Sequence, residues 1–398
     1  MRALRHRDFL LLWTGALASF IGSWIQTVAQ GYLVYQMTGS ERLLAEVTFA
    51  GSLPVTILGP FAGSLTDLVN KRLLLNLAQA IFAIGALFLA AATYYHFVQY
   101  WHIVVTALVL GVVSCFEVPT RQSIVSRVVP PEDLAGAIPI NAAAFNVARL
   151  IGPAIGGKLL QYFGPETCYF INGISFFALI FAALAIKADL SASKKEPQPI
   201  KDLLVEGMLY TFRNTALKTL FILECTISAF GLFYIALMPA LAKKVLHLDK
   251  AGLGNCYSAV GVGSVTSLLL LSWLSVRPIK AMLLRGAMSV LGLSLLALSF
   301  VESPWVAYVI FATLGFGAVA QFNITNMAFQ TLAPDRLRGR AIAMHMWALS
   351  GVAPFGTLAM GYLAEMTSIQ LTLRLGSIIV LAGALYAIAF PKTLRELR

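Results

Sequence analysis

Residues 9–40 read FLLLWTGALASFIGSWIQTVAQGYLVYQMTGS, and none of them is charged. A helix needs about 20 mainly apolar residues to cross a bilayer, so this run is long enough to span one. It is too long for a signal peptide, and no small-residue cleavage site follows a short apolar core. The whole chain of 398 residues is 59% hydrophobic and 12% charged, whereas soluble domains carry about 25% charged residues. The sequence therefore predicts an all-α integral membrane protein.

Polar and Pro/Gly-rich joints divide the sequence into twelve predicted transmembrane spans. We expect them at residues 9–37, 44–66, 73–95, 102–129, 136–162, 167–187, 216–242, 251–275, 281–301, 305–332, 341–365 and 371–390. Lys and Arg gather in alternate joints, which is the bias that marks cytosolic loops. This bias accounts for the net charge of +11 without a nucleic-acid partner. It also predicts that both termini face the cytosol.

The longest polar joint lies near the middle of the chain and reads KADLSASKKEPQPIKDLLVEGMLY, residues 187–210. It contains both signs of charge and two prolines, as expected for a linker between two bundles. We therefore predict an N-terminal six-helix bundle over residues 1–187, a cytosolic linker over 188–215, and a C-terminal six-helix bundle over 216–398.

The two halves also repeat. The segment VPPEDLAGA (129–137) resembles LAPDRLRGR (332–340), and further on Gly152 and Gly157 fall over Gly356 and Gly361. Two parallel six-helix repeats are a transporter architecture, with the substrate bound between the repeats near the bilayer midplane. The repeat therefore predicts two pseudo-symmetric bundles.

The joint after the second span reads GSLTDLVNKR, residues 63–72, and resembles the loop signature G-x-L-A-D-R-x-G-R-K of the major facilitator superfamily. We predict a conformational latch formed by Gly63, Asp67, Lys71 and Arg72. The resemblance implies that the aspartate helps to hold the outward-facing state. Leu68 replaces the arginine of the signature and Asn70 replaces its glycine, where we expect asparagine to adopt the left-handed backbone. The alternative is an ordinary solvated turn.

The fifth span contains ARLIGPAIGG, residues 148–157, whose end resembles the fifth-helix antiporter signature of the same superfamily. The matching residues are Gly152, Pro153, Gly156 and Gly157. Small residues let helices approach closely, and a proline frees a backbone carbonyl and permits a bend. We predict a hinge and packing seam here, and the resemblance implies a role in conformational switching.

Three charged residues lie within the fourth and fifth spans. Arg149 must face protein or water rather than lipid, and the nearest candidate partner is Glu117, in the segment CFEVPTRQS (115–123). Arg121 follows Glu117 by four residues, so the two side chains share a helix face, and Pro119 between them suggests a kink. We predict a Glu117–Arg121–Arg149 cluster, which either orders the two helices or takes up and releases a proton.

Polar side chains within other spans are candidates for a substrate cavity, although each of the amides is equally able to bond between helices. The candidates are Gln26, Gln30, Tyr32, Asn141, Asn146, Glu224, Gln321, Asn323 and Asn326. Glu224 is either a proton site facing the cavity or a side chain that reaches the interface. His345 lies one turn into the eleventh span, where we expect an interfacial side chain, and the alternative is a proton relay.

Motifs for other chemistry are absent from the sequence. No G-x-x-x-x-G-K-[ST] loop is present for ATP, and no H-E-x-x-H or G-x-S-x-G motif lies at a membrane face. No C-x-x-C pair is present among the four cysteines, which are Cys115, Cys168, Cys225 and Cys256. We interpret them as small, packed hydrophobic residues. We therefore predict no enzyme activity, no catalytic residues, no metal site and no cofactor.

Residues 4–40 and 101–157 resemble the bacterial branch of the superfamily that contains the enterobactin exporter and drug–proton antiporters. This resemblance implies a secondary active transporter of the bacterial inner membrane that exports a small organic amphiphile, siderophore-like or drug-like, by alternating access. The proton gradient would drive it, and its partners would be the substrate, protons and the lipid bilayer. We expect a monomer. The alternatives are a lysolipid flippase or siderophore importer on the same fold, and a non-transporting membrane sensor.

Overall fold

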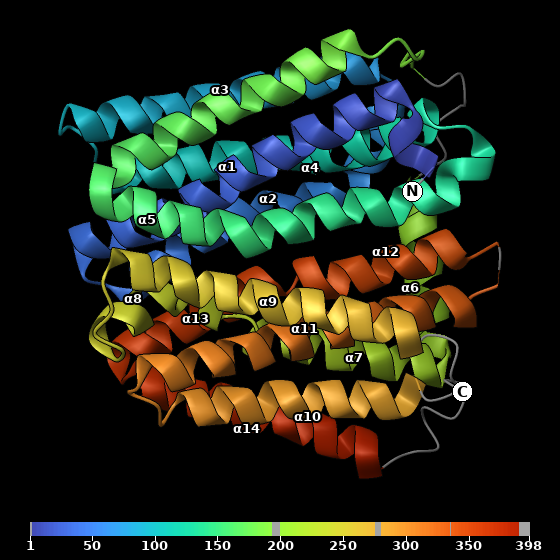
Figure 1. Cartoon of the computed structure of the whole chain (residues 1–398). Coiled ribbons are helices and arrows are strands. Elements are labelled where there is room, and N and C mark those ends of the chain that lie inside the picture. Colours follow the sequence, from blue (N-terminus) through green and yellow to red (C-terminus); the bar gives the residue numbers. More distant parts are fainter. Residues whose placement is uncertain (1, 193–199, 275–279, 335, 390–398) are drawn as a thin grey trace. The chain divides into compact units, whose positions relative to one another are not determined.

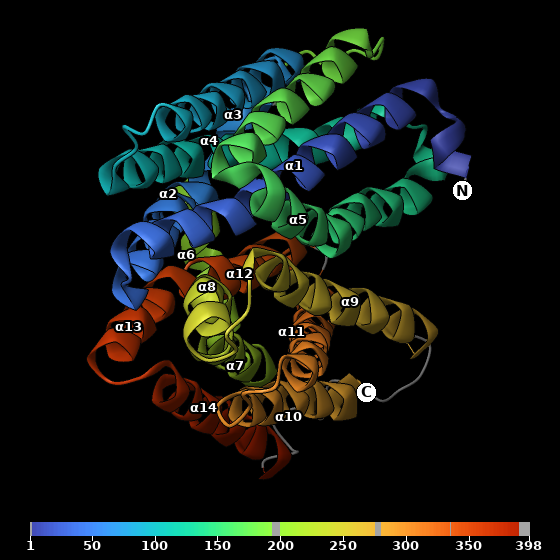
Figure 2. The same ribbon diagram turned by 60° about the vertical axis from the view of Figure 1, so that its left-hand side comes forward.

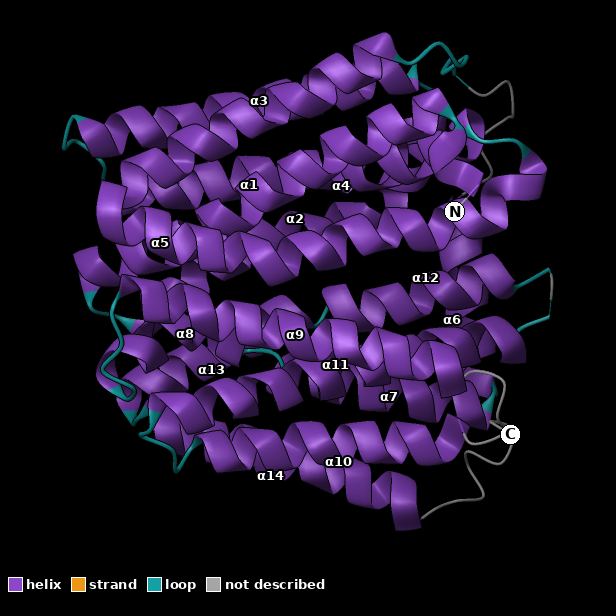
Figure 3. Ribbon diagram, viewed as in Figure 1, coloured by secondary structure: helices purple, strands orange, loops and turns teal. Residues whose placement is uncertain are grey.

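The computed structural model describes residues 2–192, 200–274, 280–334 and 336–389, and side chains at 63, 64, 67 and 200–204 lie outside the described part. Within these ranges the chain is helical, with short connecting loops (Figure 3). After a 3-10 helix at Arg2–Arg5, the α-helices are α1 Arg7–Thr38, α2 Glu41–Asp67, α3 Lys71–Tyr94, α4 Tyr100–Val128, α5 Pro131–Ala185, α6 Ile200–Arg213, α7 Thr215–Phe230, α8 Tyr234–Lys244, α9 Lys250–Leu274, α10 Lys280–Leu298, α11 Pro304–Leu332, α12 Arg338–Ser350, α13 Ala353–Met366 and α14 Ile369–Ala389.

Two compact units make up the chain. Unit 1 comprises Met1–Thr38, Ala50–Gln198 and Asp249–Ser258, and unit 2 comprises Gly39–Phe49, Pro199–Leu248 and Ala259–Arg398. The first turns of α2 therefore belong to unit 2, and the first turns of α9 belong to unit 1. The bundle boundaries predicted at residues 187 and 216 do not include this exchange of helix ends between the two units. They stay a prediction.

In unit 1, α1 packs along α5, and α3 lies against α4 and α5 (Figures 1 and 2). A core of apolar side chains fills the end of these helices near the start of α1, with Phe9, Leu12, Leu75, Ile124 and Leu179 all fully or almost fully buried. These residues come from α1, α3, α4 and α5, so the core joins all four helices. In unit 2, α10 packs against both α11 and α14.

Eleven stretches of the described residues are long and apolar enough to cross a membrane. One of them, α5, is 55 residues long and contains both of the spans predicted at 136–162 and 167–187. Its two arms meet at Gly164, whose φ of 80° is a backbone angle that favours glycine. The spans predicted at 167–187 and 136–162 are thus joined without a loop.

The spans predicted at 216–242 and 341–365 are each interrupted. The first divides into α7 and α8 around Gly231, and the second into α12 and α13 around Gly351. The capping backbone at both glycines stays in the right-handed region, so the helical hydrogen bonding changes without a sharp reversal. By contrast, α4 continues through Pro119 from Tyr100 to Val128, so the kink expected there does not divide the helix.

Candidate functional site: two buried acidic groups

The first buried acid is Glu117 in the middle of α4. Arg121, one turn later on the same helix, donates from Nε to Glu117 Oε1 at 2.8 Å, and both side chains are buried. The side-chain amide of Gln79 of α3 donates to the same oxygen at 3.4 Å, and the Ser19 hydroxyl of α1 donates to the side-chain Oε1 of Gln79 at 3.4 Å. A carboxylate paired to an arginine in its own helix is thus connected to two neighbouring helices.

Arg121 and Arg149 both lie over aromatic rings of α1. The Arg121 guanidinium is 4.6 Å from the centre of the Phe20 ring, and that of Arg149 is 5.9 Å from the Trp24 ring. The Phe145 ring of α5 is 5.5 Å from Phe20 and 6.1 Å from Trp24, centre to centre. The two arginines therefore border one aromatic group, and cation–π attraction favours both positions. The proton-coupling role predicted for Glu117, Arg121 and Arg149 stays a prediction.

The glycines of the fifth-span motif lie where helices meet most closely. A Cβ at Gly152 would lie 2.7 Å from Trp24 Cβ, and one at Gly156 would lie 2.9 Å from Ile25 Cα. Gly157 faces the start of α9, where a Cβ would lie 2.9 Å from Gly254 Cα. These residues therefore form a packing seam. Pro153 lies within α5, where Gly164 alone among the described residues has non-helical angles, so the bending expected at Pro153 stays a prediction.

The described latch residues contact the end of α5. Arg72 donates to the Ile186 carbonyl at 2.5 Å and to the Ala188 carbonyl at 3.4 Å, as basic side chains commonly do at helix C-termini. Lys71 is buried and donates to the Thr66 carbonyl at 3.4 Å. The side chain of Asp67 and the surroundings of Gly63 lie outside the described part of the structure, so the latch itself stays a prediction.

The left-handed backbone expected at Asn70 is wrong. Asn70 has a φ of −59° and serves as the N-cap of α3, where its side-chain oxygen accepts from the backbone N–H groups of Arg72 at 3.0 Å and Leu73 at 3.2 Å. Capping satisfies amides that have no partner within the helix. The asparagine therefore replaces the glycine of the signature through its side chain and not through its backbone.

Most of the predicted cavity amides bond to protein. Gln26 is buried and accepts from Asn172 of α5 at 2.6 Å, which is a contact between helices. Asn146 and Asn323 each donate to the carbonyl one turn earlier on their own helix. The remaining contacts are those of Asn326 with Gln330, of the Tyr32 ring with Lys250 Nζ at 5.1 Å, and of Gln321 with Glu224.

Two candidates have less defined surroundings. Asn141 Oδ1 is buried and has no hydrogen-bond partner in the part of the chain that the structure describes. Gln30 is partly exposed on α1. Neither residue forms a hydrogen bond, ion pair or ring contact with another candidate in the described part of the chain, so the substrate cavity stays a prediction.

The second buried acid is Glu224 of α7. Gln321 of α11 donates to its Oε2 at 2.7 Å and to Thr325 Oγ1 at 3.1 Å. His345 of α12 places Nδ1 at 3.9 Å from the same carboxylate oxygen, and both Glu224 and His345 are fully buried. Both side chains are therefore enclosed by protein and neither reaches water in this structure, whereas the depth expected for them in the membrane stays a prediction.

Sequence reasoning missed the Glu224–His345 contact, although the repeat offered one signal. Helices α4 and α11 are both 29 residues long, and Gln321 occupies the same position along α11 as Glu117 does along α4. That register places a polar side chain of α11 at the position equivalent to Glu117. It does not reveal which neighbouring helix supplies the charge.

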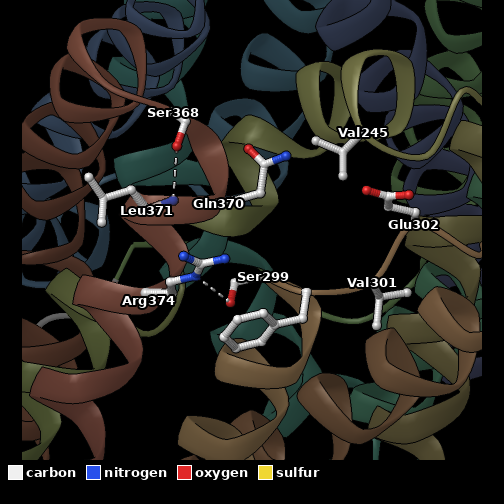
Figure 4. Close-up of a pocket in the computed structure, with 9 residues that line it drawn as sticks. Val245, Ser299, Val301, Glu302, Ser368, Gln370, Leu371 and Arg374 are labelled. Carbon is white, nitrogen blue, oxygen red and sulfur yellow. Dashed lines mark hydrogen bonds between the residues drawn. The ribbon is translucent and has the colours of Figure 1, made fainter.

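A pocket of about 390 Å³ lies in unit 2 where α10 ends and α14 begins (Figure 4). Arg374 donates from Nε to the Ser299 hydroxyl at 3.3 Å, and its guanidinium lies 4.3 Å from the centre of the Phe300 ring. Glu302 lies on the opposite side of the pocket in Figure 4. The lining of this pocket includes none of the residues predicted for the substrate cavity.

These features define a class of protein: a multi-pass membrane transporter of the major facilitator fold. The structure of the nucleoside transporter NupG matches with a TM-score of 0.78 over 97% of this chain and 99% of that chain, at 15% identity. A family profile described as transmembrane secretion effector matches residues 1–397. The chain therefore belongs to this family of the major facilitator superfamily.

Curated relatives cover nearly all of the chain. The multidrug efflux pump Tap of Mycobacterium tuberculosis is 24% identical, over 99% of this chain and 95% of that protein. The staphyloferrin A transporter of Staphylococcus aureus is 22% identical, over 89% of this chain and 88% of that protein. The family consists of transporters, which confirms the expectation that the chain is not an enzyme.

Proposed function

We propose that this protein is a secondary active transporter that exports a small organic amphiphile across the bacterial inner membrane by alternating access. The observation that carries the proposal is the match to a multidrug efflux pump along 99% of the chain. The positive-inside bias supports cytosolic termini. A monomer with no cofactor is sufficient for this function, since the energy would come from the proton gradient.

Glu117 is the residue through which the N-terminal unit would be coupled to protons. Its carboxylate is buried and held by Arg121 at 2.8 Å, so a proton can replace the arginine only if the two groups separate during the cycle. Arg149 on the neighbouring aromatic group offers a second cation near this path. Bound substrate and a bound proton would then exclude one another at the same charge cluster, so proton uptake would accompany substrate release.

A siderophore is a second candidate substrate, and the relationship to the staphyloferrin A transporter favours it. A siderophore carrier on this fold moves its substrate either outward or inward. The substrate and the direction of flux are therefore separate questions for the same assay.

Transport by purified protein in proteoliposomes tests the proposal. A panel of labelled amphiphilic drugs and a siderophore is offered from each side of the membrane, with and without an imposed proton gradient. We expect flux of an amphiphile toward the outside that depends on the gradient. Flux only toward the inside would overturn export, and flux that ignores the gradient would overturn proton coupling.

Two variants address Glu117. Glu117→Gln leaves Arg121 buried and unpaired, whereas Glu117→Gln with Arg121→Gln removes both charges and serves as the matched form. We expect both to lose the response to the proton gradient, while Glu132→Gln, an exposed acid in the first turn of α5, retains it. Unchanged proton dependence in the double variant would show that Glu117 does not couple transport to protons.

A further inference from the structure

Three helices of unit 2 enclose a polar cluster that the proposed function does not use. Glu224 comes from α7, Gln321 and Thr325 from α11, and His345 from α12. The rings of Phe322 and Phe329 lie 5.1 and 5.6 Å from the His345 ring, centre to centre. Apolar rings on the imidazole exclude water from the cluster, so its polar atoms depend on one another.

The cluster leaves three polar atoms without hydrogen bonds. Glu224 Oε1 and both ring nitrogens of His345 have no hydrogen-bond partner among the described residues, although all are buried. Buried polar atoms in proteins are almost always paired. At 3.9 Å, the separation of His345 Nδ1 and Glu224 Oε2 exceeds a hydrogen bond, and a small side-chain rotation would close it.

The charges around the cluster do not neutralise a carboxylate. No Lys or Arg nitrogen lies within 4.0 Å of the Glu224 carboxylate in the described parts of α6, α11, α12, α13 and α14, the helices packed on α7. The titratable groups next to Glu224 are His345 on α12 and Cys225 on its own helix. From α11 the facing groups are the neutral Gln321 and Thr325.

We propose that Glu224 and His345 form a second proton-binding site, which holds one proton between them in the packed state of unit 2. The proton comes from water on the side to which the site opens, forms an O–H bond with the Glu224 carboxylate, and returns to water when that bond breaks. No electron is transferred. With this proton bound, both side chains are neutral, and burying them does not require a buried charge.

Proton loss would act on the two interrupted spans. Glu224 lies shortly before the interruption at Gly231, and His345 lies shortly before the one at Gly351. Ser228 of α7 donates to the Leu349 carbonyl, which ties the two helix ends together. An ionised Glu224 requires a protonated His345 or water, and water reaches the buried carboxylate only if α7 and α12 separate. The site thereby links proton occupancy to the packing of these helices.

Infrared difference spectra of the purified protein between acidic and alkaline pH test the site without substrate. We expect the C=O band of a buried protonated carboxylic acid in the wild type and its loss in Glu224→Gln. His345→Asn should move the midpoint of the band by about one pH unit or more, because the ring is the nearest titratable group. Glu132→Gln, with an exposed carboxyl group, should change neither.

Persistence of the band in Glu224→Gln would overturn the site, and an unchanged midpoint in His345→Asn would overturn the pairing. If the Glu224→Gln variant does not fold, the midpoint of the band in the His345→Asn variant alone tests the site. Any role of the site in transport rests on the proposed function, whereas proton binding at the site does not. Proton-driven export without the band would refute the site alone, whereas the band without export would refute the proposed function alone.

Discussion

Glu117 and Glu224 are both buried carboxylates in the middle of a membrane protein, yet the two units neutralise them differently. Glu117 is paired to Arg121 on its own helix, four residues away. Glu224 has an amide from α11 and an imidazole from α12. The first pair survives any rigid movement of its helix, whereas the second arrangement exists only while three helices stay together. A carboxylate paired within one helix keeps its partner when that helix moves as a rigid body, whereas one held between helices loses its partners when the helices separate.

The largest predicted effect separates the two acids by stability. Arg121→Gln leaves Glu117 buried without a cation, which should lower the free energy of unfolding by about 3–5 kcal/mol. Glu224→Gln leaves no unpaired charge and should cost less than about 1.5 kcal/mol. Unfolding of the purified proteins in detergent measures both, with the Glu117→Gln, Arg121→Gln double variant as control. Equal losses for Arg121→Gln and Glu224→Gln would remove the distinction between the acids.

A second test asks whether the helices pack equally closely in the two units, although the buried charges of the units differ. Gly152 lies against Trp24, and Gly356, its counterpart in the repeat, lies against the backbone of Ala229. Replacing either with valine overpacks a helix contact and should cost about 1–3 kcal/mol. The matched controls are Gly136→Ala and Gly339→Ala, since a Cβ at either position meets no atom within 4 Å. Tolerance of valine at only one of the two positions would show that the seams are not equivalent.

A smaller effect concerns the aromatic support of Arg121. Phe20→Leu removes the ring that lies 4.6 Å from the guanidinium. The cation–π attraction should be worth about 0.5–2 kcal/mol. A double-mutant cycle of Phe20→Leu and Arg121→Leu isolates this coupling from the loss of apolar contact, and Phe170→Leu on the exposed face of α5 serves as control. Additive losses would mean that the ring contributes packing alone.

An acid outside the membrane gives the smallest effect and a reference for the buried pair. Hydrogen bonds from the Ser191 side chain and backbone lower the pKa of Asp189 below its usual 3.8. A lowered folded-state pKa adds stability above the unfolded pKa, and this stability is lost as the pH falls through the folded pKa. Asp189→Asn should therefore destabilise slightly at neutral pH and not at all well below pH 3.8. Unfolding measured at both pH values checks this, and a difference that grows in acid would contradict it.

The fold could be predicted from the sequence because a membrane span is recognised from the residues within it. Uncharged runs such as 9–40 and the repeat of Gly152 and Gly157 in the second half require no knowledge of distant contacts. The membership of the major facilitator superfamily is confirmed by the family match over residues 1–397. The interruptions at Gly231 and Gly351 were not predicted, because a glycine within an apolar run equally well marks close packing.

The candidate site was predictable only where it is local. The facing positions of Glu117 and Arg121 follow from helix geometry, since residues four apart share a face. The burial of His345 beside Glu224 depends on how α7 and α12 pack, and no periodicity in either helix reports that. Arg72 was assigned to a latch by its motif, yet its observed contacts are with the carbonyls of Ile186 and Ala188, which lie far away in sequence.

The joint at Gly164 bears on how the protein reaches the membrane during synthesis. The two apolar arms of the 55-residue helix α5 have no loop between them that could cross the bilayer alone. Because only a tight turn joins them, we expect the two arms to insert as one hairpin, with their orientations set together. A basic residue added near Gly164 would oppose the positive-inside bias of both arms at once. We therefore expect such a residue to disturb the insertion of the fifth and sixth spans together.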